Sequence, residues 1–166
     1  MSGFNSSAQL AGDTLRLNFA GTIDEDVTFP KVEDGSQQKI VLDLKDIKTI
    51  NSVGIREWLN WIKPLSEKYE IVLENCPKAM VFQFNMVEGF LPAKAKVTSF
   101  FVPFYCESCD REDNVLFTVG KEVSASGGAV KIDFDVKAAN LCGKGEPCDV
   151  EMDVTEAKYF QFLKRA

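Results

Sequence analysis

The chain has 166 residues, of which 45% are hydrophobic, and it carries 25 acidic against 19 basic residues. This length and apolar content suffice to bury a core, so we expect a folded domain with at most a small second unit, and not disorder. The acidic balance and the lack of a Lys/Arg cluster argue against nucleic acid as a partner, and the absence of histidine excludes Ser-His and Cys-His nucleophiles.

The sequence has no apolar run of signal-peptide type at its N-terminus, and no stretch long and apolar enough to insert into a membrane. We therefore expect a cytoplasmic protein. Cysteines in that compartment are reduced or bound to metal, because glutathione and thioredoxin keep disulfides from persisting.

The first half of the chain predicts alternating strands and helices. Residues 1–13 are small and polar without a sustained period, and we expect a flexible N-terminal arm. Residues 15–19 alternate apolar and polar side chains, which predicts a strand with one buried face. Residues 39–44 are almost continuously apolar between charged flanks, which predicts a strand covered on both faces.

A helix is predicted over residues 53–69, because apolar side chains recur there at helical spacing. Pro64 lies inside it, and we expect a kink or break near Lys63 because proline removes a backbone hydrogen bond. Residues 71–73 and 96–102 predict two more strands. Between them, Pro77 suits the first turn of a helix. The expected apolar face of that helix comprises Ala79, Met80, Phe82 and Val87.

Strands that alternate with helices at short intervals predict an α/β fold with a mixed sheet and helices packed on it. Two motifs then give a family resemblance: Gly21-Thr22-Ile23-Asp24, and Asn51-Ser52-Val53-Gly54 after a strand. In this order and spacing they resemble the STAS domain of anti-sigma-factor antagonists and sulfate-transporter tails. The resemblance covers roughly residues 15–102, and we assign residues 14–102 to a STAS-like domain.

The resemblance implies a regulatory protein-binding module and no enzyme. In the antagonist branch of the family, the serine of D-S-x-G is phosphorylated, and this blocks binding to an anti-sigma factor that is a serine kinase. Ser52 stands at that position, whereas Asn51 replaces the aspartate. The implied partner-binding residues are Asp24, Asn51, Ser52, Val53, Gly54 and Arg56.

Each of these residues also has an ordinary structural interpretation. Ser52 at a helix start can cap the helix by accepting a backbone N–H. Asp24 can cap a turn. Arg56 and Trp61 fall at the rim of the helix's apolar stripe, where they suit a binding surface, although Trp61 can equally cover the edge of the core.

Beyond Val102 the pattern changes, and we assign residues 103–166 to a second unit. Residues 115–119 and 130–136 predict a hairpin around the turn at residues 124–128. Asp153 and Glu156 have the spacing of a capping box, which predicts a closing helix over residues 157–165.

Four cysteines flank this hairpin as a CxxC pair, Cys106 and Cys109, and a wider pair, Cys142 and Cys148. Four thiolates suit a structural Zn²⁺, and the order of strands and pairs resembles a zinc ribbon. Scattered thiols and a redox role for Cys106 and Cys109 are the alternatives. Cys76 is most simply a small buried residue.

Three functions follow, in order of preference. The first is an anti-sigma-factor antagonist-like interaction module, switched by phosphorylation at Ser52. The second is a STAS scaffold without a switch, whose zinc ribbon mediates assembly. The third is a thiol oxidoreductase. The runs around Phe90 and at residues 159–163 suit either contact sites or core.

Overall fold

The structure is a computed structural model that describes residues 3–143 and 148–165. The chain divides into two compact units, Met1–Thr98 and Ser99–Ala166. The predicted boundary after Val102 is therefore displaced, because the predicted strand over residues 96–102 divides into two strands at Thr98 that belong to different units.

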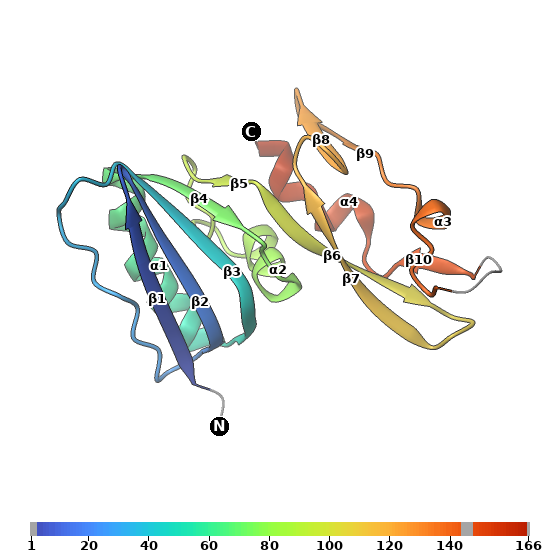
Figure 1. Cartoon of the computed structure of the whole chain (residues 1–166), viewed down its shortest axis with the longest axis horizontal. Helices are drawn as coiled ribbons and strands as arrows, with labels where there is room; N and C mark the ends of the chain where they lie inside the picture. The colour runs from blue at the N-terminus through green and yellow to red at the C-terminus, as the bar shows by residue number, and fades with distance from the viewer. Residues whose placement is uncertain (1–2, 144–147, 166) are drawn as a thin grey trace. The chain divides into compact units, whose positions relative to one another are not determined.

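The first unit is a five-stranded sheet with the strand order β1-β2-β3-β4-β5 (Figure 1). The pair β1–β2 is antiparallel and every other pair is parallel. Its elements are β1 (Phe4–Ala11), β2 (Thr14–Ile23), β3 (Lys39–Ile50), α1 (Ser52–Lys68), β4 (Glu70–Glu74), α2 (Lys78–Met86) and β5 (Lys96–Val97). The predicted α/β class with a mixed sheet is confirmed.

The predicted flexible arm is wrong for residues 4–11, which form strand β1 beside β2. A two-residue turn joins the strands, and its first residue, Gly12, has a φ of 62°. Such left-handed geometry suits a tight hairpin, whose twist matches that of the strands. The strand escaped prediction because all its side chains except the half-buried Phe4 are exposed, which leaves no apolar alternation to read.

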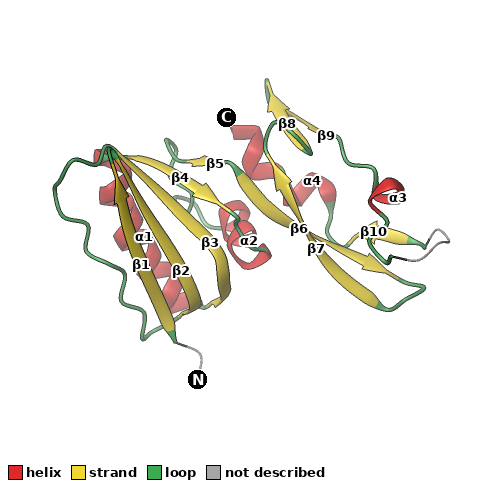
Figure 2. Cartoon of the chain, viewed as in Figure 1, coloured by secondary structure: helices red, strands yellow, loops and turns green. Residues whose placement is uncertain are grey.

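Helix α1 lies along one face of the sheet, where Figures 1 and 2 show it behind the strands. Its side chains Trp58 and Ile62 are fully buried, as the predicted stripe requires. The helix continues without a break through Pro64. Pro64 and Asn60 are both exposed, so water can bond the Asn60 carbonyl that the missing N–H leaves unpaired.

The predicted apolar face of α2 is wrong in part, because Phe82 is 39% exposed. The helix instead buries Met80, Val81 and Phe84. Phe90 is fully buried and stacks on Trp58, whose indole N–H donates to the Phe90 carbonyl at 2.8 Å. Phe90 is therefore core.

The second unit contains a three-stranded sheet, β10-β6-β7, and a separate hairpin, β8–β9. Both pairs of the sheet and the hairpin are antiparallel. The elements are β6 (Ser99–Cys106), β7 (Arg111–Thr118), β8 (Val123–Ser126), β9 (Ala129–Ile132), α3 (Val136–Ala139), β10 (Val150–Met152), α4 (Glu156–Tyr159) and the 3₁₀ helix η1 (Gln161–Arg165).

The predicted pairing of residues 115–119 with residues 130–136 is wrong. The turn at Gly127 and Gly128 joins β8 to β9, whereas β7 pairs with β6 through the loop that carries Cys109. A short loop brings sequential strands together at a lower entropic cost than the longer connection does.

The closing segment also differs from its prediction. The predicted capping box of Asp153 and Glu156 does not form, because the N-cap residue of α4 is Thr155, whose side chain makes no capping hydrogen bond, and Glu156 is already the first helical residue. The segment divides into α4 and η1 because packing decides its shape. Tyr159, Phe160, Phe162 and Leu163 are all buried, and three of them contact the ring of Phe100. This run is core.

Candidate functional site

The first candidate site is the start of α1, where the chain leaves β3. The Asn51 N–H donates to the Ile23 carbonyl at 3.1 Å, which ties the end of β3 to the end of β2. Asn51 is the N-cap residue, and its Oδ1 accepts from the Gly54 N–H at 2.9 Å. The capping role considered for Ser52 is therefore wrong. Ser52 is the first helical residue, and it is exposed.

Gly54 brings the first turn of α1 against the end of β2. A Cβ atom built on Gly54 would lie 2.1 Å from the Ile23 carbonyl oxygen, so a side chain does not fit without a shift of the backbone. The glycine of the S-x-G motif therefore serves close packing. This close contact with Ile23 fixes the first turn of α1 and with it the position of Ser52. Gly54 itself is buried, so it offers a partner little surface.

Glu25 belongs to this site, although the sequence did not single it out. Its Oε2 accepts from the Asn51 side-chain N–H at 2.8 Å. Its backbone hydrogen bond and then the Asn51 amide hold the pKa of the Glu25 carboxyl below its usual value. The available signal was the acidic run at residues 24–26, directly after the buried end of β2.

Asp24 caps a turn, as its structural interpretation predicts. Its Oδ1 accepts from the Asp26 N–H at 3.0 Å, and its carbonyl accepts from the Val27 N–H at 3.1 Å. This turn carries Glu25 to Asn51. The site therefore has a carboxylate and a helix N-terminus beside one exposed serine.

The remaining residues proposed for partner binding differ in how much they offer. Val53 is half-buried. Arg56 is exposed, and its Nε lies 4.0 Å from the carboxylate of its neighbour Glu57. Trp61 lies in an aromatic cluster, where it stacks on Phe29 and donates its indole N–H to the Pro30 carbonyl at 2.8 Å. Trp61 therefore covers the edge of the core.

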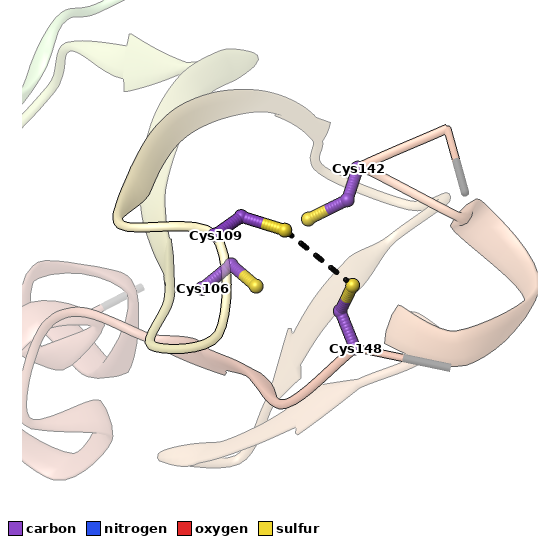
Figure 3. A group of neighbouring side chains, drawn as sticks. All are labelled: Cys106, Cys109, Cys142 and Cys148. Carbon is purple, nitrogen blue, oxygen red and sulfur yellow. Dashed lines mark hydrogen bonds between the residues drawn. The ribbon is translucent and has the colours of Figure 1, made fainter. Parts of the chain in front are cut away.

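The second candidate site gathers the four predicted cysteines, Cys106, Cys109, Cys142 and Cys148 (Figure 3). Their sulfur atoms all lie within 4.8 Å of one another, and the sulfurs of Cys109 and Cys148 are 3.6 Å apart. Zn–S bonds of about 2.3 Å in a tetrahedron put sulfurs about 3.8 Å apart. The cluster is thus compatible with one metal ion.

Local structure explains why the sulfurs meet. Cys106 ends β6 and Cys109 lies in the loop before β7, which turns at Asp110 with a φ of 48°. On the other side, Asn140 ends α3 in a left-handed conformation ahead of Cys142. Pairing of Val150 in β10 with Cys106 in β6 then carries the neighbouring Cys148 to the first pair.

Cys106 is buried and the other three are half-buried, so the centre is shielded from solvent only in part. The hydrogen bond to Cys106 and then burial raise the pKa of the Cys142 thiol to about 12, and the hydrogen bond to Cys109 is the main cause of a raised pKa at Cys148. Catalytic thiols have lowered pKa values. These two thiols are instead protonated at neutral pH, and a metal ion that binds them would displace their protons.

Cys76 is the small buried residue that the sequence predicts. It is fully buried, and burial, followed by the negative charges of Asp43 and Glu74, raises the pKa of its thiol well above the usual value. Such a thiol stays protonated and unreactive.

No protein-family model matches the chain, and a search of curated proteins finds no match either. Within the described residues, no helix combines the length and the apolar composition that crossing a membrane requires.

Proposed function

We propose that the chain is a regulatory protein-binding module of STAS type, with Ser52 at the centre of its contact surface. The observation that carries this proposal is that Asn51, and not Ser52, caps helix α1. Asn51 makes the capping hydrogen bond, so the exposed Ser52 hydroxyl has no structural duty in the helix start. It is free to meet a partner or to be modified. The mixed α/β sheet agrees with what the resemblance implies.

Phosphorylation of Ser52 is the proposed switch. A phosphate there lies at the positive end of the α1 dipole, where anions are tolerated, so the fold can keep its shape. It adds about two negative charges beside the acidic run at residues 24–26. A partner that accepts the neutral surface is then repelled. The resemblance implies an anti-sigma factor with serine-kinase activity as that partner.

The four-cysteine centre is proposed to hold structural zinc in a small zinc-ribbon-like unit. The sulfur-only donor set and the sulfur separations fit Zn²⁺, and four protein ligands leave no open coordination position for a substrate. Metal binding would supply folding energy to a unit of modest size. Cys106 and Cys109 lie at the end of β6 and in the loop before β7, not at a helix N-terminus that would lower a thiol pKa, and this supports zinc over thiol oxidoreductase chemistry. Reduced thiols and zinc also suit the cytoplasm.

One observation favours a second function, a scaffold without a phosphate switch. The hydrogen bond between Asn51 and Glu25 keeps a carboxylate next to Ser52, and this charge opposes a phosphate. In that case, the same surface binds its partner constitutively, and the cysteine unit contributes to assembly.

Capture from the native lysate distinguishes these functions. We would compare the wild type with two variants. Ser52→Asp adds a negative charge, and Ser52→Asn introduces a side chain of the same shape as aspartate without the charge. The switch predicts that the wild type and Ser52→Asn enrich a serine kinase of anti-sigma type, identified by mass spectrometry, and that Ser52→Asp does not. Circular dichroism should be the same for all three proteins.

Equal capture by all three would remove the switch and support the scaffold. Incubation of the captured kinase with ATP and the wild type gives a direct check, because mass spectrometry should then find the phosphate on Ser52. A kinase that leaves Ser52 unmodified would contradict the proposal.

A further inference from the structure

Strand β1 forms one end of the five-stranded sheet, and its outer side is open. It pairs with β2 on one side, and no described residue pairs with the other side. Seven of its eight residues are exposed, from Asn5 to Ala11. Figure 1 shows β1 as the last strand at its end of the sheet.

The backbone groups that face outward can be identified from the register. The Thr22 N–H donates to the Gly3 carbonyl at 3.3 Å, so these two residues form a hydrogen-bonded pair of the antiparallel ladder. Such pairs alternate with pairs that are not hydrogen-bonded. Residues Asn5, Ser7 and Gln9 therefore bond to β2. The intervening residues direct their N–H and C=O groups to the open side, and they are Phe4, Ser6, Ala8 and Leu10.

Strand β1 itself has none of the features that usually protect an edge strand against pairing with a further strand. Natural sheets guard their edges with charged side chains, proline, bulges or very short strands. β1 is eight residues long, it contains no charged residue and no proline, and its eight pairs with β2 run without a bulge. The opposite edge shows the contrast, because β5 has only two residues.

We infer that β1 pairs with β1 of a second copy of the chain, antiparallel, around a twofold axis at Ser7. In this register Phe4 lies opposite Leu10, Ser6 opposite Ala8, and Asn5 opposite Gln9. Each apolar side chain thus lies opposite an apolar one, each small side chain opposite a small one, and each amide opposite an amide, on the same face of the sheet. The pairs formed by Phe4, Ser6, Ala8 and Leu10 are also those whose backbone groups face outward, so both requirements select one register.

Charge and exposure support a second copy as the occupant. The chain has a net charge of −6, yet β1 itself is uncharged, so two copies meet at a neutral place on an otherwise acidic molecule. Leu10 is 53% exposed, and in the dimer it would contact Phe4 of the other copy. That Phe4 is held in place by ring contacts with Phe19 and Phe29 of the same copy. The two sheets become one continuous sheet. Ser52 takes no part, so the inference goes beyond the proposed function.

The test uses charge at the axis. Ser7 faces itself there, in a pair without hydrogen bonds, where opposed side chains lie closest. Sedimentation equilibrium of the wild type should give twice the chain mass of 18.5 kDa. Ser7→Lys and Ser7→Asp should each weaken self-association at least about tenfold, because they oppose like charges. An equimolar mixture of the two variants should restore the dimer.

Ser7→Thr is the matched control, since it keeps a neutral hydroxyl at the same exposed position and should remain dimeric. Circular dichroism and thermal melting establish that each variant is folded. A wild type that stays monomeric at high concentration would overturn the inference and leave the edge to a strand of another protein. A dimer unaffected by Ser7→Lys, or a mixture that does not reassociate, would overturn it equally.

Discussion

Asn51 uses both ends of its side-chain amide at the start of α1. The oxygen accepts from Gly54, as any good N-cap residue does, and the nitrogen donates to Glu25. Aspartate and asparagine cap helices equally well, but only asparagine can donate to a carboxylate. Asn51 stands where the D-S-x-G motif of the STAS resemblance has aspartate, and its side-chain N–H donates to an acidic residue at position 25.

We predict that Asn51→Asp raises the pKa of Glu25. The substitution keeps the cap and the backbone hydrogen bond of Glu25, removes the Asn51 amide as the second donor that lowers this pKa, and places a second negative charge beside the carboxylate. A carboxyl group with a lowered folded-state pKa stabilises the fold above its unfolded pKa, and loses that contribution as the pH falls through the folded value. Asn51→Asp should therefore cost stability at neutral pH and much less in acid.

An NMR titration of the Glu25 side-chain carbon measures this pKa. Asn51→Ser is the matched control, because it caps without donating to Glu25 in the same way and adds no charge, so it should raise the pKa by less. A Glu25 pKa that does not change in Asn51→Asp would show that the hydrogen bond has no energetic weight.

At the scale of elements, burial decided what the sequence could predict. β2, β3, β4 and α1 bury one face or both, and their apolar residues follow the period of the element. β1 carries almost no buried side chain and left no such trace. Pairing depends on contacts between distant residues, so the register of β7 with β6 could not be derived from local patterns.

Gly54→Ala is predicted to destabilise the first unit by about 2 kcal/mol or more, because overpacking a tight contact typically costs about 1–3 kcal/mol. The new Cβ would meet the Ile23 carbonyl at 2.1 Å, which forces α1 away from β2. The higher helix propensity of alanine returns at most about 1 kcal/mol. Urea denaturation followed by tryptophan fluorescence measures the change, since Trp58 is buried in this unit.

Gly3→Ala serves as the matched control, because nothing lies within 4 Å of the Cβ that it adds. It should leave the free energy of unfolding nearly unchanged. If Gly54→Ala were as stable as Gly3→Ala, the close approach of α1 to β2 would not constrain this position, and the role assigned to the glycine of the S-x-G motif would be wrong.

At the scale of the whole molecule, the sequence predicted which four cysteines gather, although not how. The CxxC spacing pointed to one pair, and the second pair was inferred from its position across the strands. The pairing of β10 with β6, which carries Cys148 to Cys106, has no local signal because β10 is only three residues long. The ligand residues could therefore be predicted from the sequence, whereas the strand pairing that brings them together could not.

The reactivity of the five cysteines can be used to follow the two units separately, because Cys76 is buried in the first unit and the other four form the four-cysteine centre of the second.

With zinc bound, we predict that no thiol reacts with a chromogenic disulfide reagent. A chelator should release about one zinc and expose four thiols, because metal binding supplies folding energy on the order of 10 kcal/mol in such sites. Denaturant should then expose the fifth thiol, that of Cys76.

Cys76→Ala is the control. In this variant the number of reactive thiols after chelation should stay at four and should not rise on unfolding. Four thiols that react at once in metal-free protein, with a melting temperature that zinc does not change, would contradict a structural metal and leave the cluster as reduced thiols brought together by the fold.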